Sequence, residues 1–312
     1  MRQPGLSITL EELIKLRLES RLLSFLNPST VYARETGEYL SGFRGRGMDF
    51  EETRSYQWGD DIRTMDWKVT ARTGVAHTKI FKEERERPIF IVSEFSPSLF
   101  FGTKNRLKSI SAAKAAALIA WAAIGEGARV GAVIASPAGY VEHAPKSRRL
   151  GILPLLKTLS IVSNPFETHS DIDKASQEPS SNADLAGALE RVQTIAPPRS
   201  LIFILSDFQS SPLQIKKPLS TVAAHHDVTA YYLLDPLEKK LPPPNHYVIT
   251  NGSQLSILNT HAKKLHMAYQ KQFNEHFESI KTLCTSLGVS LLTLSTEDDI
   301  VKILRQQGEH CG

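Results

Sequence analysis

The sequence predicts an α/β protein with a mostly parallel, doubly wound sheet that carries helices on both faces. Short apolar runs typical of buried strands alternate with helical stretches over most of the chain. The first unit consists of the strand IFIVSEF from Ile89, an alanine-rich helix over 109–125 and the strand RVGAVIAS. The second consists of a helix over 183–195, the strand SLIFILS, a helical stretch through Ala224 and the strand DVTAYYLL. Alternation of strands and helices in this order is typical of a parallel sheet covered on both sides.

The amino-terminal residues predict a helix that precedes the sheet. Thr9-Leu-Glu-Glu12 has the form of a capping box, in which the first and last side chains each bond a free backbone amide. Apolar residues follow at helical spacing, so we expect a helix over about 9–26. Asn27-Pro28 then ends it.

The second half of the chain contains three further predicted features. The polar, turn-rich stretch over 163–182 is interpreted as a long flexible loop. Asn251-Gly252 between HYVIT and SQLSI predicts a hairpin with a two-residue turn. We then expect a long helix over about 261–287, the strand VSLLTL and a short final helix from Glu297.

Composition and charge narrow the function classes. The chain has 37 basic and 33 acidic residues, a net charge of +4, and the two signs are interspersed. This charge pattern therefore disfavours nucleic-acid binding. There is no apolar run near the roughly 18 residues of a membrane helix and no signal-peptide apolar region, so we expect a cytoplasmic protein. Cys284 and Cys311 lie far apart without a Cys-x-x-Cys pattern, which predicts neither a zinc site nor a disulfide.

The segment GRGMDFEETRSYQWGDDIRTMDWKVTARTG over 45–74 alternates charges around two tryptophans. In one interpretation it is structural: its arginines pair with its aspartates, Trp58 and Trp67 fill pockets, and Gly59 supplies a special backbone shape. The residues assigned to this role are Gly59, Asp60, Asp61, Arg63, Asp66, Trp67 and Arg72, with Arg54 as a further pairing arginine. In the other interpretation the segment recognises a partner, since tryptophan and arginine often anchor interfaces. The residues assigned to partner binding are Arg44, Arg46, Trp58, Arg85 and Arg87.

One set of side chains has the pattern of a metal site. Glu94, Ser96 and Ser98 follow one predicted strand and Asp207 follows another. Ligands of doubly wound sheets bind beyond the carboxyl ends of strands, and Mg²⁺ prefers oxygen ligands. In the alternative interpretation, the serines cap the following turn and the aspartate bonds loop amides. The sequence contains no phosphate-binding loop, zinc helix or nucleophile elbow.

The charged segment, continuing through FKEERERPIFIV and EFSPSLFFGT, resembles the bacterial domain-of-unknown-function family 58, specifically over 42–103 and more loosely in ILSDF and LLDPLEKKLP. The resemblance implies a von Willebrand A-like domain, a MoxR-type AAA+ ATPase as partner, and a metal-ion-dependent adhesion site. Such a site uses Asp-x-Ser-x-Ser, a threonine and an aspartate. Here Glu94 stands at the first aspartate position and Ala183 at the threonine position, where Ser181 or Asp184 would have to compensate.

We therefore predict three parts: an amino-terminal helical arm over 1–41, a charged module over 42–87 and a von Willebrand A-like domain over 88–312. The predicted function is that of a non-catalytic adaptor that binds a MoxR-type ATPase and helps remodel or mature a protein complex, with Mg²⁺ as the only cofactor considered. The alternative is a metal-dependent hydrolase that uses Glu94 and Asp207 together with Asp60 or Asp61. A nucleic-acid binder, whose affinity would fall steeply with salt, is the third class.

Overall fold

The computed structural model describes residues 5–25, 48–58, 61–83, 87–164, 177–178, 183–250 and 255–310. The chain divides into two compact units. The large unit comprises Met1–Ala33 and Arg87–Gly312, and the small unit comprises Arg34–Glu86. The described part of the predicted amino-terminal arm, residues 5–25, thus belongs to the same unit as the large sheet.

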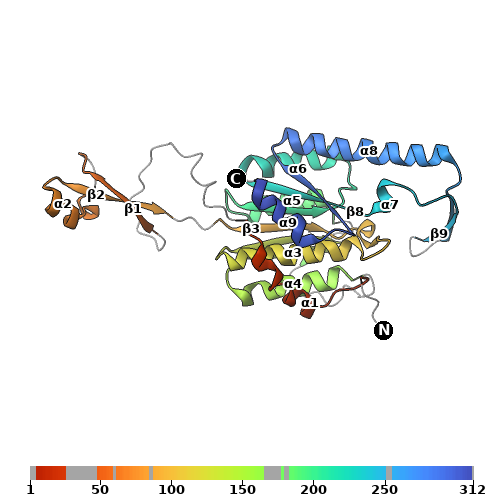
Figure 1. Cartoon of the computed structure of the whole chain (residues 1–312), viewed down its shortest axis with the longest axis horizontal. Helices are drawn as coiled ribbons and strands as arrows, with labels where there is room; N and C mark the ends of the chain where they lie inside the picture. Colours follow the sequence, from red (N-terminus) through yellow and green to blue (C-terminus); the bar gives the residue numbers. More distant parts are fainter. Residues whose placement is uncertain are drawn as a thin grey trace. The chain divides into compact units, whose positions relative to one another are not determined.

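The large unit is built on a sheet that has seven strands among the described residues, in the order β11-β8-β7-β3-β4-β5-β6 (Figure 1). The parallel strands are β3 (Ile89–Glu94), β4 (Val130–Ser136), β7 (Leu201–Ser206), β8 (Asp227–Leu234) and β11 (Ser290–Ser295). At one edge β5 (Gly139–Lys146) and β6 (Gln177–Glu178) run antiparallel. The chain enters the sheet at its centre and winds outward to both edges, so the predicted doubly wound sheet is confirmed.

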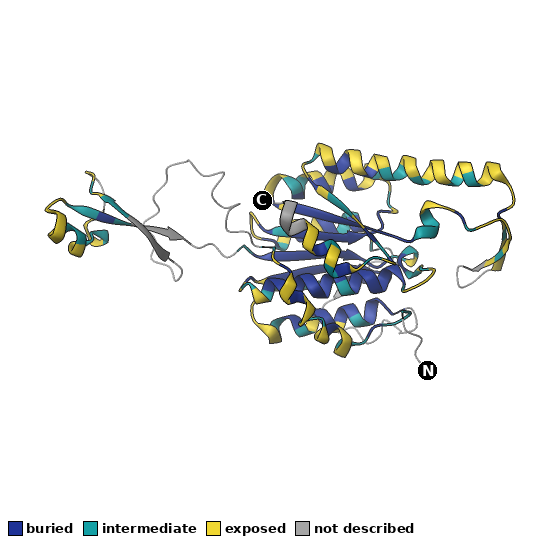
Figure 2. Ribbon diagram, in the orientation of Figure 1, coloured by how far each residue is buried: buried dark blue, intermediate teal, exposed yellow. Residues whose placement is uncertain are grey.

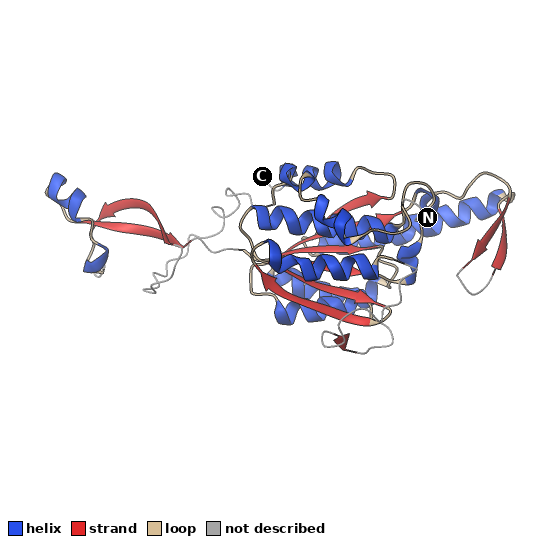
Figure 3. Cartoon of the chain, turned by 90° about the horizontal axis from the view of Figure 1, so that it is seen from below, coloured by secondary structure: helices blue, strands red, loops and turns tan. Residues whose placement is uncertain are grey.

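Helices cover both faces of the sheet, as Figures 1 and 3 show. One face packs against α1 (Leu10–Lys15), α3 (Lys108–Gly125), α4 (Arg149–Val162) and α9 (Ile300–His310). The other packs against α5 (Leu185–Ile195), α6 (Pro212–His225) and α8 (Lys263–Ser286). Successive side chains of β3 point to opposite faces of the sheet. Ile89 and Ile91 belong to the core on the first face, and Phe90 and Val92 belong to the core on the second. Every residue of β3 is buried, which explains its continuous apolar sequence (Figure 2).

Helix α3 is buried on nearly all sides. The small side chains of its alanines let α1, α4, α9 and the sheet approach closely, and residues from Lys108 to Ala123 are almost all buried. A helix that is apolar around its circumference is typical of a core position. The one lysine at its start is therefore an exception that calls for a compensating charge.

The predicted helix over 9–26 is shorter than expected. The capping box is confirmed, with Glu12 N donating to Thr9 Oγ1 at 3.2 Å and Thr9 N donating to Glu12 Oε2 at 2.8 Å. The α-helix then ends at Lys15, and a 3-10 helix, η1 (Glu19–Leu22), follows. Trp121 Nε1 donates to Leu13 O at 3.0 Å, so a side chain of α3 takes the carbonyl that would otherwise accept from the next helical turn. Residue 26, the last residue of the predicted helix, lies outside the described part of the chain.

Elements near the carboxyl end follow the predictions with small shifts. β9 (His246–Thr250) and β10 (Leu255–Asn259) pair antiparallel as the hairpin signal predicts, while the turn residues Asn251 and Gly252 lie outside the described residues. Helix α8 matches the predicted helix over 261–287, and α9 begins at Ile300 rather than at Glu297. Most of the predicted loop over 163–182 also lies outside the described residues. No helix of the described chain has the length and apolarity needed to cross a membrane.

The small unit is a two-stranded sheet with helical turns in the connection between its strands. β1 (Met48–Ser55) pairs antiparallel with β2 (His77–Glu83), and η3 (Ile62–Thr64) and α2 (Trp67–Thr73) lie between them. Asp66 caps α2 by accepting from Lys68 N and Val69 N, and Gly74 ends the helix with a left-handed φ of 72°. Thr64 Oγ1 and Thr78 Oγ1 lie 2.8 Å apart, which ties the connection to β2.

Candidate functional site at the strand ends

The carboxyl ends of β3 and β7 bring Glu94 and Asp207 to the same edge of the sheet. The two strands pair in parallel with Ser93 opposite Leu205, so Glu94 ends β3 level with the end of β7. Both side chains are buried: Glu94 is 5% exposed and Asp207 is 1% exposed. This arrangement agrees with the prediction from the sequence that the two carboxylates meet at one edge of the sheet.

The hydroxyl groups at this edge bond to near neighbours. Ser206 Oγ donates to Glu94 Oε2 at 2.7 Å and accepts from Phe208 N at 2.9 Å. Ser96 Oγ and Ser98 Oγ lie 2.9 Å apart and share a hydrogen bond. Ser96 precedes the 3-10 helix η4 (Pro97–Phe100), but its side chain makes no capping hydrogen bond. The expected capping role of this serine is therefore wrong.

A buried lysine supplies the positive charge at this edge. Lys108 is the first residue of α3, and its side chain is fully buried. Its Nζ donates to Asp207 Oδ2 at 2.7 Å and to Glu238 Oε1 at 2.6 Å. Asp207 thus faces an ammonium group rather than the loop amides of the alternative interpretation.

A capping box positions Glu238 against this lysine. The short helix α7 (Pro236–Lys239) begins after Asp235, whose N donates to Glu238 Oε2 at 2.8 Å. The Asp235 carboxylate accepts from Leu237 N, from Thr103 N and Oγ1, and from Thr296 Oγ1, at 2.7 to 3.0 Å. Burial raises the pKa of Asp235, but these donors outweigh it and the net shift is downward. This anchored aspartate fixes the start of α7 and with it the carboxylate of Glu238.

Burial raises the pKa of Glu94 to about 7. The hydrogen bond from Ser206 opposes the shift, and the charges of Asp207 and Asp184 add to it. Near neutral pH a substantial fraction of this carboxyl group is therefore protonated.

The remaining positions of the implied adhesion site do not complete a metal centre. Ala183, at the threonine position, has only a methyl group, and Ser181 lies outside the described residues. Asp184 caps α5 by accepting from Gly187 N at 2.9 Å and also bonds Tyr140 Oη at 3.2 Å. Within the described chain, no three or more His, Cys, Asp or Glu side chains are grouped so as to hold a metal ion. Of the described residues at the implied ligand positions, Asp207 is paired with Lys108 and Ala183 has no oxygen to offer, so these residues do not fit a divalent cation.

Lys108, Asp235 and Glu238 were missed by the sequence analysis. A lysine in the first turn of a helix is unfavourable because the amino end of a helix carries partial positive charge. Two sequence features could have pointed to these residues. One is a lysine at the start of an alanine-rich helix, and the other is Asp-Pro-Leu-Glu from Asp235, which has the form of a capping box.

The charged segment does not form the expected arginine–aspartate pairs among its described residues. Asp61 accepts from Arg63 N at 2.9 Å and Asp66 caps α2, so both carboxylates stabilise backbone turns. The nearest ammonium to Asp66 is that of Lys79, at 3.9 Å. A structural role for the two aspartates therefore holds, but through capping rather than ion pairing.

The two tryptophans of this segment do not fill pockets, which corrects the structural interpretation. Trp58 is fully exposed, Trp67 is 65% exposed, and Ile62 between them is 61% exposed. Of the other residues assigned to partner binding or to the signature, Arg44, Arg46, Gly59, Asp60 and Arg85 lie outside the described residues. Arg87 belongs to the large unit, where it forms an ion pair with Asp227 and donates from Nε to Arg199 O at 3.1 Å.

The family described as "Protein of unknown function DUF58" matches residues 52–279 of this chain. The chain belongs to this family. Similar proteins include the uncharacterized proteins Rv1480 of Mycobacterium tuberculosis and Mb1516 of Mycobacterium bovis. Each is 30% identical over 265 residues, which are 84% of this chain and 79% of the relative.

Two similar solved structures are the conserved hypothetical protein BatB from Bacteroides thetaiotaomicron and a von Willebrand factor type A protein from Catenulispora acidiphila. The first has a TM-score of 0.41 at 9% identity and covers 72% of this chain and 98% of its own. The second has a TM-score of 0.39 at 10% identity and covers 76% of this chain and 44% of its own.

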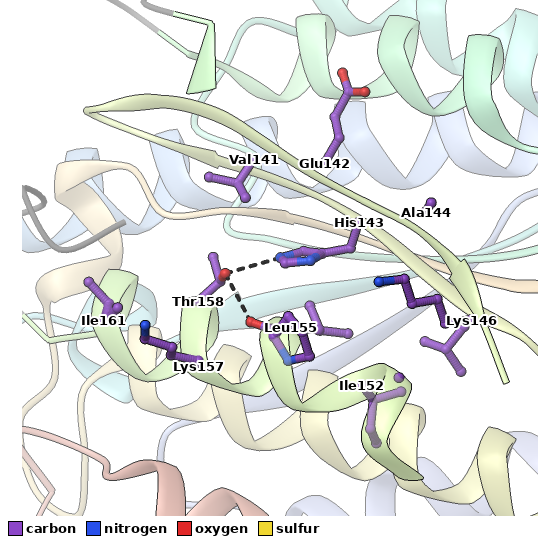
Figure 4. Close-up of a pocket in the computed structure, with 13 residues that line it drawn as sticks. Val141, Glu142, His143, Ala144, Lys146, Ile152, Leu155, Lys157, Thr158 and Ile161 are labelled. Carbon is purple, nitrogen blue, oxygen red and sulfur yellow. Dashed lines mark hydrogen bonds between the residues drawn. The ribbon is translucent and has the colours of Figure 1, made fainter. Parts of the chain in front are cut away.

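A cavity of about 340 Å³ between β5 and α4 is a second candidate site in this DUF58 protein (Figure 4). Its polar centre is His143, whose ring points toward Thr158 at an Nε2–Oγ1 distance of 3.0 Å. Thr158 donates its own hydrogen to Pro154 O, so His143 Nε2 must be the donor to Thr158. Burial, aided by Lys146, lowers the pKa of His143 to about 4, so the ring is neutral near pH 7.

The cavity offers no acidic partner that would make this histidine a catalytic base. Glu142 points to the opposite face of β5, where it accepts from Arg191 Nη1 at 2.7 Å. The ring of His143 instead fixes β5 to α4 through Thr158.

Proposed function

We propose that this DUF58 protein is a non-catalytic adaptor that binds a MoxR-type AAA+ ATPase and helps remodel or mature a protein complex. The observation that carries the proposal is the exposure of large apolar side chains in the connection between β1 and β2. These four side chains, named here the tryptophan surface, are Trp58, Ile62, Trp67 and Val75, each at least 55% exposed.

Exposed tryptophan is costly unless a partner covers it, because each side chain leaves a large apolar area in water. Tryptophan is also the residue type most enriched among the side chains that dominate binding energy at interfaces. The tryptophan surface therefore supports partner binding by the small unit.

The strand edge supports binding rather than hydrolysis as the function of the protein. Asp207 and Glu238 face Lys108, and the hydroxyl of Ser206 holds Glu94. A metal-dependent hydrolase needs carboxylates that converge on an ion beside a substrate cleft. No observation favours that alternative.

The test is binding of the purified protein to the MoxR-type ATPase of the same genome, with ATP held unhydrolysed by an analogue. We expect Trp58→Ala and Trp67→Ala to weaken the Kd by about 30-fold each, the effect of losing about 2 kcal/mol at an anchor residue. Leu213→Ala is the matched control, because Leu213 is 83% exposed but lies on α6 of the large unit.

Equal binding by the tryptophan variants and the control would refute this surface as the contact. Absence of any binding by the wild-type protein would refute the ATPase as the partner. Thermal unfolding of each variant provides the second readout. Loss of binding counts only where the unfolding midpoint of the variant matches that of the wild type.

A further inference from the structure

We infer that the ammonium group of Lys108 is a built-in cation that takes the place of a divalent metal at the strand edge, so that this edge functions without any metal ion. The inference concerns the chemistry of the sheet edge and does not depend on the partner of the small unit. It rests on the position of Lys108, on the state of every other oxygen at the edge, and on the cost of the buried charges.

Lys108 lies between two carboxylates, those of Asp207 and Glu238. Its Nζ lies 2.7 Å from Asp207 Oδ2 and 2.6 Å from Glu238 Oε1, and its side chain has no solvent exposure. Asp207 follows β7, the strand next to β3, and Glu238 lies on α7, which follows β8, so the ammonium joins two segments that follow separate strands. Joining loops at the carboxyl ends of strands is also what a metal ion would do there.

The buried charges need this cation for stability. A carboxylate removed from water without a partner is strongly destabilising, and Asp207 is only 1% exposed. Lys108 in turn lies at the amino end of α3, where the helix dipole disfavours a positive charge. Each group compensates the unfavourable location of the other.

The other oxygens at the edge are already engaged or badly placed for a metal. Glu94 Oε2 accepts from Ser206, the hydroxyls of Ser96 and Ser98 bond each other, and Asp184 caps α5. Among these groups, Asp207 Oδ1 is the buried oxygen that accepts no hydrogen bond. Magnesium is usually held by one or two carboxylates and several waters, and here the carboxylate with a free oxygen, Asp207, is already paired with the ammonium of Lys108.

The full burial of Lys108 has a consequence for recognition. A metal ion at such an edge can be reached by a carboxylate of a partner, which then completes its coordination. The ammonium of Lys108 cannot be reached in this way, since its side chain is 0% exposed. Recognition by this chain therefore uses surfaces other than the cation of the strand edge.

The experiment compares thermal unfolding of the full chain in EDTA and in millimolar Mg²⁺ or Mn²⁺, with calorimetric titration of Mn²⁺ as a second readout. For the wild type we expect midpoints within about 1 °C of each other and no heat of binding. A metal present at 100 times its Kd would raise the midpoint by about 5 to 10 °C. Such a rise, if abolished by Asp207→Asn, would overturn the inference.

A second comparison tests the role of the lysine itself. Lys108→Met keeps the length of the side chain and removes its charge, and we expect the midpoint to fall by about 6 to 20 °C. The double variant Lys108→Met/Asp207→Asn should recover part of that fall, because both charges are then absent. Lys114→Met, a half-buried lysine of the same helix, is the control.

An unchanged midpoint for Lys108→Met would overturn the inference, because a cation that compensates buried carboxylates cannot be removed without loss. If Lys108→Met fails to fold while the double variant folds, the inference is supported, because removal of the Asp207 charge then relieves the uncompensated buried charge. If the double variant is no more stable than Lys108→Met, the lysine acts through packing alone and the inference fails.

Discussion

The substitution Glu94→Gln should make this protein more stable at alkaline pH and should leave its stability unchanged in mild acid. The carboxyl group of Glu94 has its pKa raised from 4.5 to about 7 because it is buried. The folded protein therefore binds a proton at this group that the unfolded chain has already released. Stability contributed by the protonated group is fully present below about pH 4.5 and is lost as the pH rises through 7.

The magnitude follows from the difference between the two pKa values. The rise of about 2.5 pKa units corresponds to about 3 kcal/mol of unfolding free energy at about 1.36 kcal/mol per unit. About 2.5 kcal/mol of this is lost between pH 5 and pH 8. Glutamine keeps the shape and still accepts from Ser206 Oγ, but it carries no proton to lose.

The assay is urea unfolding of the wild type and of Glu94→Gln at several pH values from 5 to 8. The difference in unfolding free energy between the two proteins cancels the titration of all other groups. Glu190→Gln, which changes an exposed carboxylate on α5, is the control. A constant difference between wild type and Glu94→Gln across this range would refute the assignment of a raised pKa to this buried carboxyl group.

Two further predictions concern the contacts that fix β5 and the amino-terminal arm. In NMR titrations, His143 should stay neutral with its proton on Nε2 from pH 8 down to about pH 5, because burial lowers its pKa to about 4. Titration near pH 6.5 would show that burial does not lower this pKa. Trp121→Phe should destabilise the protein by about 1 kcal/mol and speed hydrogen exchange in α1, because it removes the donor to Leu13 O. Exchange in α1 that matches the wild type would show that this bond does not hold the arm.

The sequence alone determined the fold class and most elements, because these depend on local patterns. The continuous apolar run of β3, the alternation of strands and helices, the capping box at Thr9 and the Asn-Gly hairpin signal all act within about a dozen residues. It also located Glu94 and Asp207 at one sheet edge, because the carboxyl ends of parallel strands meet there.

Tertiary structure decided the features that depend on residues distant in sequence. Trp121 shortens the first helix from 108 positions away by taking the carbonyl of Leu13. Lys108 reaches Asp207 across 99 positions and Glu238 across 130, and no local pattern encodes such a contact. The exposure of Trp58 and Trp67 is likewise a result of what surrounds them, since a tryptophan has the same local sequence preferences in a core and at an interface. The order of the strands therefore determines where the carboxylates of the sheet edge lie, and long-range packing determines that the ammonium of Lys108 pairs with Asp207 there.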